Sequence, residues 1–242
     1  MTMIRVKSVA CDNEVMRSPE AARHVVGVLK DGGLAVVPLD VSYAFLAASQ
    51  EPLARIFELK LRPASKRCSI LASWKHFLDA ADAAPGPLRR MQRVVDAGFP
   101  LGILARPAWE SDTVAAIPKD CVDLLLKDEK LALFINMGAM STELIEAAEK
   151  VGIQLFGSSA NISGSGNSFT LDEVPAALLE AADVVCEGGT CRYANPERLA
   201  STIVDLDTSN LTRRGALHEE IERLLKMSDD TNDHVSHDRA AS

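Results

Sequence analysis

The sequence of 242 residues contains no long hydrophobic run and no glycine-rich nucleotide signature. Without a stretch of about 18 apolar residues it offers no candidate membrane helix. Met1 to Cys11 also lacks the apolar segment of a signal peptide. We therefore expect a cytoplasmic protein that does not bind a membrane. The GxGxxG and Walker A patterns are both missing, so a nucleotide would have to bind by another route.

Cysteine and histidine chemistry finds little support either. The five cysteines are scattered and odd in number, and only Cys186 and Cys191 lie close together, with no histidine at zinc-like spacing. We interpret the cysteines as buried free thiols. The five histidines form no recognisable catalytic triad. We therefore predict no metal site built from these residues.

The balance of charges is acidic, with 26 Lys and Arg against 34 Asp and Glu and a formal net charge of −8. This balance argues against a broad surface that coats nucleic acid, but it leaves room for a local basic pocket. The 47% share of hydrophobic residues is typical of an ordinary globular protein.

Apolar runs and helical patterns alternate irregularly along the chain, which favours one α/β domain with a mixed sheet over a doubly wound domain. We predict a single domain over residues 1–226 and a polar, disordered tail over residues 227–242. Among the local predictions are a first strand at Met3–Val9 and an edge strand at Val114–Ile117. A capping box at Thr170–Glu173 predicts a helix that continues to about residue 181.

The most polar strand end lies at Phe156–Gly164. An apolar stretch, Gly152 to Phe156, is followed by small hydroxyl residues, one asparagine and two glycines. Their hydroxyl, amide and N–H groups can bind an anion, and α/β sheets bind ligands at strand ends. The same composition is also common in ordinary turns, so the loop alone is weak evidence.

Three further clusters could meet this loop in space. They are Asp40–Tyr43, Lys60–Arg62, and Ser201–Thr202 together with Arg213–Gly215. Their cations, hydroxyls and amide groups suit the binding of phosphates and a carboxylate while a phosphoryl or nucleotidyl group moves. Taken singly, each cluster also fits a surface turn, a helix end or an ordinary strand.

The order of these motifs along the chain is specific. From about Ser18 to Leu217 the sequence contains Pro38-Leu-Asp-Val-Ser-Tyr-Ala44, Lys60-Leu-Arg-Pro63, Phe99-Pro-Leu-Gly102, Ser159-Ala-Asn-Ile-Ser-Gly164, Gly188-Gly189, Ser201-Thr-Ile-Val-Asp205 and Arg213-Arg-Gly-Ala216. In this order and spacing the motifs resemble the YrdC/YciO family, whose best-known activity is threonylcarbamoyl-AMP synthase.

The resemblance implies a twisted mixed sheet flanked by helices, with a deep, positively charged cavity. It also implies a reaction that joins L-threonine, bicarbonate and ATP into threonylcarbamoyl-adenylate and releases pyrophosphate. Mg²⁺ would bridge phosphate oxygens. A partner enzyme would then use the product to modify tRNA.

The family's functional residues carry over to positions of this sequence. The resemblance implies that four residues bind the amino-acid carboxylate and the triphosphate: Lys60, Arg62, Ser159 and Asn161. It places Ser158, Ser201 and Arg213 near the nucleotide, and it makes Asp40 and Tyr43 candidates for substrate contacts.

Several positions depart from the family pattern. Leu39 and Val41 replace two threonines, Gly102 replaces another, and Phe134 replaces a phosphate-side arginine. A site that loses the partners of a substrate hydroxyl loses roughly 10²-fold or more in discrimination. A changed amino substrate is therefore an open alternative to threonine. The candidates to replace the missing arginine are Arg67, Arg106 and Arg214.

We therefore predict an ATP-dependent threonylcarbamoyl-AMP synthase-like nucleotidyltransferase whose amino substrate is threonine or another compound. One alternative is a non-catalytic module that binds a nucleotide, tRNA or double-stranded RNA, although the acidic balance counts against RNA. Another is a degenerate paralogue that is retained for a protein partner.

Overall fold

The structure, a computed structural model, describes residues 19–63 and 65–227. Its centre is a nine-stranded mixed sheet with the strand order β7-β1-β2-β6-β3-β5-β4-β8-β9. The strands are β1 (Ala35–Pro38), β2 (Tyr43–Ala47), β3 (Ser69–Leu71), β4 (Leu101–Ala105), β5 (Leu131–Ile135), β6 (Leu155–Ser159), β7 (Val184–Val185), β8 (Ile203–Asp205) and β9 (Leu211–Arg213). The pairs β1–β7, β3–β5 and β4–β8 are parallel and the other pairs are antiparallel. The fold is thus a single α/β domain with a mixed sheet, as predicted.

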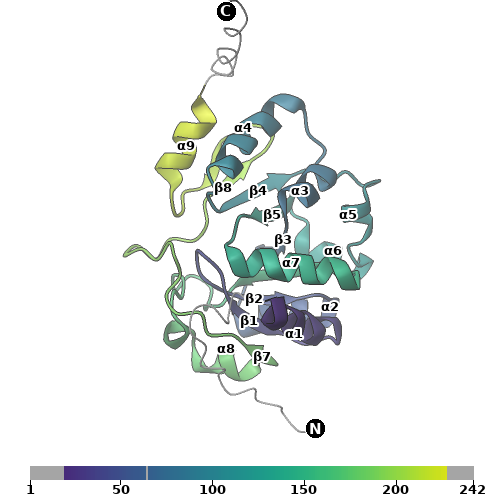
Figure 1. Cartoon of the computed structure of the whole chain (residues 1–242), viewed down its shortest axis with the longest axis vertical. Coiled ribbons are helices and arrows are strands. Elements are labelled where there is room, and N and C mark those ends of the chain that lie inside the picture. The colour runs from purple at the N-terminus through teal and green to yellow at the C-terminus, as the bar shows by residue number, and fades with distance from the viewer. Residues whose placement is uncertain (1–18, 64, 228–242) are drawn as a thin grey trace, which may run out of the picture.

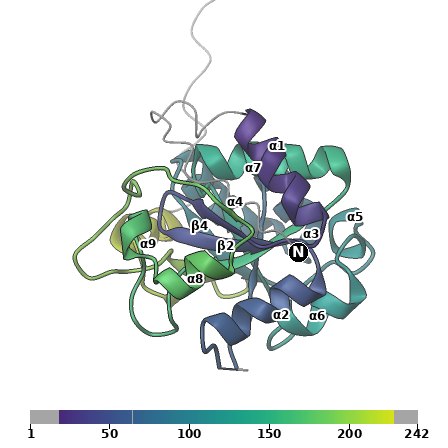
Figure 2. The ribbon, with the colours of Figure 1, turned by 90° about the horizontal axis from the view of Figure 1, so that it is seen from below.

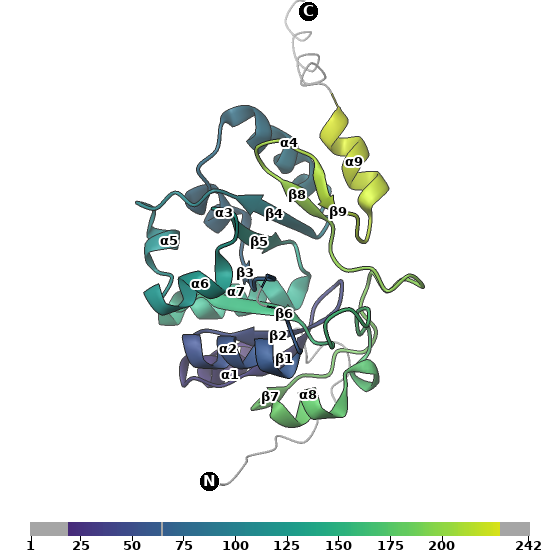
Figure 3. The same cartoon turned by 180° about the vertical axis from the view of Figure 1, so that it is seen from behind.

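Helices cover both faces of this sheet. They are α1 (Pro19–Lys30), α2 (Gln50–Leu59), α3 (Trp74–Ala80), α4 (Pro85–Asp96), α5 (Asp112–Ala115), α6 (Val122–Leu125), α7 (Ala139–Val151), α8 (Ala176–Ala181) and α9 (His218–Lys226), with 3₁₀ turns at Lys119–Cys121 and Leu171–Glu173. Helices α1 and α7 lie on one face, and α2 and α6 lie on the other (Figures 1, 2 and 3). Every helix within the described ranges is too short or too polar to cross a membrane.

The alternation of side chains along β2 and β6 separates two hydrophobic cores. Phe45 and Phe156 point into the larger core, which α2 also joins. Leu46 and Leu155 point into the smaller core under α1 and α7. Because a strand has a period of two, each strand contributes side chains to both cores. The face toward α1 and α7 also carries the cavity described below.

Two local predictions were wrong. Val114–Ile117 is not an edge strand, because Val114 lies in the short helix α5 and its N–H donates to the Ser111 hydroxyl at 3.2 Å. That cap satisfies the first turn of a helix and outweighs the β-branched side chains. The helix predicted to begin at Thr170 also does not continue unbroken to residue 181, because Pro175 has no N–H to donate to the helix. Residues 171–173 form a single 3₁₀ turn, and α8 begins after the proline.

The buried-thiol interpretation is confirmed for Cys68, Cys121 and Cys191. The strand predicted at Met3–Val9 lies outside the described residues. So do residues 228–242, which make up nearly all of the predicted tail.

Candidate functional site

A cavity of about 180 Å³ lies over the face of the sheet that α1 and α7 also cover. Its floor comes from β2, β6, β3, β5 and β8, and its walls come from the loops at their ends. The lining residues are Leu39, Ser42, Ala44, Leu46, Arg62, Arg67, Ser69, Leu71, Ala132, Phe134, Met137, Gly157, Ser158, Ser159, Ala200, Ser201, Ile203 and Arg213. A water needs only about 10–15 Å³ of such volume, so the cavity has room for a larger ligand.

Three arginines from separate parts of the chain reach this cavity. Arg62 follows α2 and donates from Nη1 to the Ser158 hydroxyl at 2.8 Å and from Nη2 to the carbonyl of Arg67. Arg67 precedes β3 and donates from Nε to the Leu126 carbonyl at 3.0 Å. Arg213 ends β9 and donates from Nε to the Ser201 carbonyl at 2.9 Å. Backbone carbonyls and a hydroxyl therefore hold the three guanidinium groups in place.

Two of these arginines bring positive charge to the cavity without a carboxylate to offset it. None of the described residues that line the cavity is acidic. Within the described ranges, neither Arg62 nor Arg213 forms an ion pair with a carboxylate. Burial, together with the charge of Arg62, lowers the pKa of Arg213 to about 10, which still leaves it protonated at neutral pH. Such an arrangement favours the binding of phosphate or carboxylate groups.

Arg62 also has an unused donor. Its Nε is buried and has no hydrogen-bond partner in the structure. A buried donor without a partner costs about 1–3 kcal/mol, so it calls for an explanation such as a bound anion or water. Burial lowers the pKa of Arg62.

Lys60 lies behind the Ser159–Gly164 loop and does not line the cavity. Its side chain is 1% exposed. The Nζ group donates to the Ser159 carbonyl, to the Asn161 carbonyl at 2.6 Å and to Asn161 Oδ1 at 3.2 Å. Burial, together with the charge of Arg62, lowers the pKa of Lys60 to about 7. Three oxygen acceptors match the three N–H donors of an ammonium group, so this geometry is that of the protonated form.

Asn161 is also turned inward and is 7% exposed. Its Oδ1 accepts hydrogen bonds from Lys60 and from the Ser159 hydroxyl, and its Nδ2 donates to the Ile162 carbonyl at 2.8 Å. Lys60 and Asn161 thus fix the loop that presents Ser158 and Ser159 to the cavity.

Asp40 and Tyr43 brace the neighbouring loop from outside the cavity lining. The Tyr43 hydroxyl donates to the Gly189 carbonyl and accepts from the Gly188 N–H, both at 3.0 Å. Burial raises the pKa of Tyr43 to about 12. The backbone N–H of Asp40 donates to the Met137 carbonyl at 2.8 Å. This last bond joins the residue 38–43 loop to the loop after β5.

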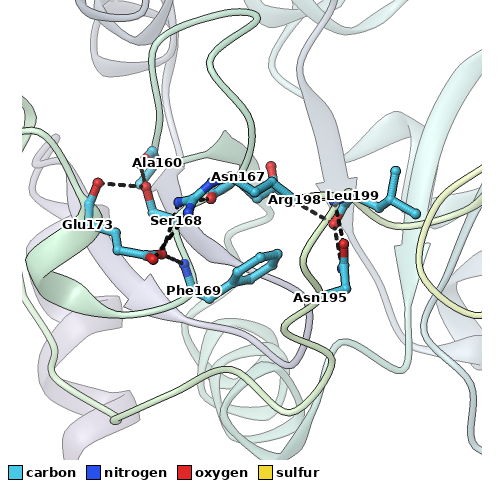
Figure 4. A network of polar contacts seen from close by, with 8 residues as sticks. All are labelled: Ala160, Asn167, Ser168, Phe169, Glu173, Asn195, Arg198 and Leu199. Carbon is cyan, nitrogen blue, oxygen red and sulfur yellow. Dashed lines mark hydrogen bonds and ion pairs between the residues drawn. The ribbon is translucent and has the colours of Figure 1, made fainter.

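A polar network fixes the segments that lead away from the Ser159–Gly164 loop and toward Ser201 (Figure 4). Arg198 donates to both oxygens of Glu173, at 3.2 and 3.0 Å, and to the Asn167 carbonyl at 2.5 Å. Glu173 in turn accepts from the Phe169 N–H at 2.6 Å. The Glu173 carboxylate is therefore committed to this network.

Five of the nine predicted site residues come together in the cavity lining: Arg62, Ser158, Ser159, Ser201 and Arg213. The other four, Asp40, Tyr43, Lys60 and Asn161, lie outside it. Of the three arginines that could replace the missing one, Arg67 lines the cavity. Arg106 is instead 51% exposed in a 3.1 Å ion pair with Asp207, and Arg214 does not line the cavity.

The sequence predicts part of this lining, because Ser42 lies in the Asp40–Tyr43 cluster and Leu39 and Phe134 are departures from the family pattern. It does not indicate Ser69 or the other apolar residues of the floor. Ser69 lies on β3, which runs between β6 and β5 in the sheet and shares their cavity-facing side. Because the sequence does not show this strand order, it could not indicate Ser69. Within the described residues, no group of three or more His, Cys, Asp or Glu side chains could hold a metal ion.

Known proteins share this fold. A family model for Sua5, YciO and YrdC proteins, described as telomere recombination, matches residues 27–215. No curated protein matches the chain. Sua5 of P. abyssi, solved in complex with L-threonine, is 24% identical with a TM-score of 0.68, and the alignment covers 86% of this chain and 58% of Sua5. This chain therefore spans less than two thirds of Sua5.

Two other solved structures are similar. E. coli YciO is 18% identical with a TM-score of 0.66, over 82% of this chain and 90% of YciO. Full-length HypF, solved in a phosphate- and nucleotide-bound form, is 16% identical with a TM-score of 0.58, over 76% of this chain and 22% of HypF. The family model covers most of the sequence, and so this chain belongs to the Sua5/YciO/YrdC family.

Proposed function

We propose that this protein is an ATP-dependent nucleotidyltransferase of the threonylcarbamoyl-AMP synthase type. It would join an amino acid, bicarbonate and ATP into a carbamoyl-adenylate and release pyrophosphate. The observation that carries the proposal is the cavity lined by Arg62, Arg67 and Arg213 with serine hydroxyls and no carboxylate. The family to which the chain belongs supports the same role.

The chemistry explains why such a cavity would need several cations. The amino group attacks the carbon of bicarbonate, and loss of water gives a carbamate. A carbamate oxygen then attacks the α-phosphorus of ATP while the bond to the pyrophosphate oxygen breaks. Both partners are anions, so their repulsion opposes the approach. Fixed guanidinium groups offset this repulsion and stabilise the charge that develops on the phosphate oxygens. Arg62 and Arg213 both line the cavity, and their guanidinium groups are the candidates for this role.

Two related structures support small-molecule binding in this fold. The P. abyssi Sua5 structure contains L-threonine, and the HypF structure is a phosphate- and nucleotide-bound form. Both ligand types, an amino acid and a nucleotide, are substrates in the proposed reaction.

Mg²⁺ would enter with the triphosphate. The described residues of the lining supply hydroxyls and backbone groups but no carboxylate, so phosphate oxygens and water would provide the ligands of the ion. When bound, it would neutralise part of the phosphate charge. The carbamoyl-adenylate is a reactive mixed anhydride, so we also propose a partner enzyme that consumes it, with tRNA as the final acceptor.

Pyrophosphate release from ATP with bicarbonate and a panel of amino acids tests the proposal. We expect release that needs both co-substrates and that falls by at least about 10²-fold in Arg62→Ala, the scale set by the loss of one transition-state hydrogen-bond donor. Arg106→Ala is the matched control, because Arg106 pairs with Asp207 outside the cavity. Release that persists in Arg62→Ala, or the same small loss in both variants, would refute the assignment of this cavity. A chain that binds ATP through these arginines without releasing pyrophosphate would be a binding module instead.

A further inference from the structure

The cavity is chemically divided. Its charged and hydroxyl groups come mainly from the loops and strand ends, whereas much of its floor is apolar. The apolar side chains are Leu39, Ala44, Leu46, Leu71, Phe134, Met137 and Ile203, with Ala132 and Ala200 at the sides. Five of these, Leu39, Ala44, Leu46, Leu71 and Met137, are less than 9% exposed.

Strand register explains how the apolar floor forms. Leu71 pairs with Phe134, Phe134 with Gly102, and Gly102 with Ile203, so their side chains share one face of the sheet. Gly102 leaves room for its neighbours, because a Cβ there would lie 3.0 Å from Phe134 Cζ and 3.1 Å from Ile203 Cγ1. The Phe134 ring therefore lies over the glycine.

Gly157, which lies nearer the arginines, also makes room for a neighbouring side chain. Gly157 pairs with Leu46 on β2 and with Ser69 on β3. A Cβ at Gly157 would lie 2.8 Å from Leu46 Cδ2 and 2.3 Å from the Phe45 carbonyl oxygen. The Leu46 side chain thus covers the strand, while the Ser69 hydroxyl is committed to the Gly157 carbonyl at 3.1 Å.

Two lining hydroxyls, those of Ser42 and Ser201, lie among the apolar side chains at this end of the cavity, and the Ser201 hydroxyl is directed at the Met137 sulfur at 3.9 Å. Leu39 enters from the residue 38–43 loop and Met137 from the loop after β5, and the two loops are joined by the bond from the Asp40 N–H to the Met137 carbonyl. Ser42 is the one lining hydroxyl of the residue 38–43 loop, all of which the structure describes. A small polar side chain bound here would exchange water for mostly apolar neighbours, which is unfavourable.

We propose that the amino substrate carries an apolar side chain. Its carboxylate would lie toward the arginines, and its side chain would lie between the floor residues Leu46, Leu71 and Phe134 and the wall residues Leu39 and Met137. This inference rests on the proposed function, and it names the class of amino acid that the site selects: branched or longer aliphatic side chains over threonine and serine.

L-Valine and L-threonine form the sharpest test, because they have the same shape and differ in one methyl or hydroxyl group. An apolar pocket distinguishes such a pair by roughly 10–100-fold. We expect calorimetric titration of the full chain without ATP to show that valine binds tighter than threonine by that factor, with leucine at least equal to threonine. Leu39→Thr should reduce the ratio of the dissociation constants of threonine and valine. Leu78→Thr, on the exposed face of α3, should leave it unchanged.

The outcomes separate this inference from the proposed function. Threonine that binds as tightly as valine, or no binding of any aliphatic amino acid at millimolar concentration, would overturn the inference. Tight threonine binding that Ser42→Ala abolishes would also overturn it and would assign the hydroxyl site to Ser42. If Leu39→Thr does not fold, the ratio in the unmodified chain decides alone. Adenylate formation from threonine in preference to valine would overturn the inference and support the proposed function. Valine binding without turnover would support the inference and overturn the proposed function.

Discussion

Gly102 and Phe134 should be energetically coupled, because the phenylalanine ring occupies the space that a side chain at position 102 would need. The two residues are register partners on β4 and β5. A Cβ at Gly102 would come within 3.0 Å of Phe134 Cζ and 3.1 Å of Cε1. Threonine adds two more heavy atoms beyond this Cβ. Gly102→Thr alone should therefore lower the free energy of unfolding by about 1–3 kcal/mol, the usual cost of overpacking.

The effect of Gly102→Thr on the free energy of unfolding should change sign once the Phe134 ring is removed. In Phe134→Ala the space above Gly102 is open on one side, and threonine suits a strand better than glycine does by about 0.5–1 kcal/mol. Ile203 Cγ1 still lies 3.1 Å from the added Cβ, so some crowding remains. We expect Gly102→Thr to be neutral or stabilising in this background, which gives a coupling energy of about 1–4 kcal/mol between the two substitutions.

A double-mutant cycle in denaturant measures this coupling. The four proteins are the unmodified chain, Gly102→Thr, Phe134→Ala and the double variant. Val184→Ala is the matched control for Phe134→Ala, because β7 and β4 are separated by five strands in the sheet. Gly102→Thr and Val184→Ala should add within about 0.5 kcal/mol. Additive effects of Gly102→Thr and Phe134→Ala would refute the packing that underlies the apolar floor.

Three further predictions concern the stability of the fold. Lys60→Met should lower the free energy of unfolding by about 1–3 kcal/mol, because three oxygens of Ser159 and Asn161 lose their donor; unchanged stability in denaturant would contradict this. Tyr43 has a pKa of about 12 in the folded chain against 10.0 ordinarily, so the unfolded chain ionises first and stability should fall between pH 10 and 12. In Tyr43→Phe the free energy of unfolding should fall less steeply with pH in this range. An identical pH dependence in both proteins would show that Tyr43 does not contribute. Gly27 is exposed in α1 with open space around its Cα, so Gly27→Ala should stabilise the fold by about 0.5–1 kcal/mol, which a lower thermal midpoint would disprove.

The class of fold could be predicted from the sequence because most strands are short apolar runs that end at turn residues. Ala35–Pro38 and Leu155–Ser159, for example, stop at a proline and a serine. The prediction failed at Val114–Ile117, where one serine hydroxyl at the start of α5 decides between strand and helix. Such local caps compete with propensity over only a few residues, which a pattern of hydrophobicity does not resolve.

The site could be predicted only in part. Arg62 and Arg213 are found from motif order, but the direction of a side chain depends on what surrounds it. Lys60 turns inward because the Ser159 and Asn161 oxygens face it, and these oxygens take their place only once the loop has folded. The stacking of Phe134 over Gly102 depends on the register of two strands that lie about 30 residues apart in the chain, which single-sequence reasoning does not fix.

The most direct test of the central claim is to follow labelled bicarbonate into an adenylate. The full chain is incubated with ATP, Mg²⁺, valine or threonine and ¹³C-bicarbonate, and the products are separated and identified by mass spectrometry. We expect a species that contains AMP, the amino acid and the labelled carbon, and we expect Arg62→Ala to form much less of it. A product without the labelled carbon, or equal amounts from Arg62→Ala and the unmodified chain, would contradict the claim that this cavity makes a carbamoyl-adenylate.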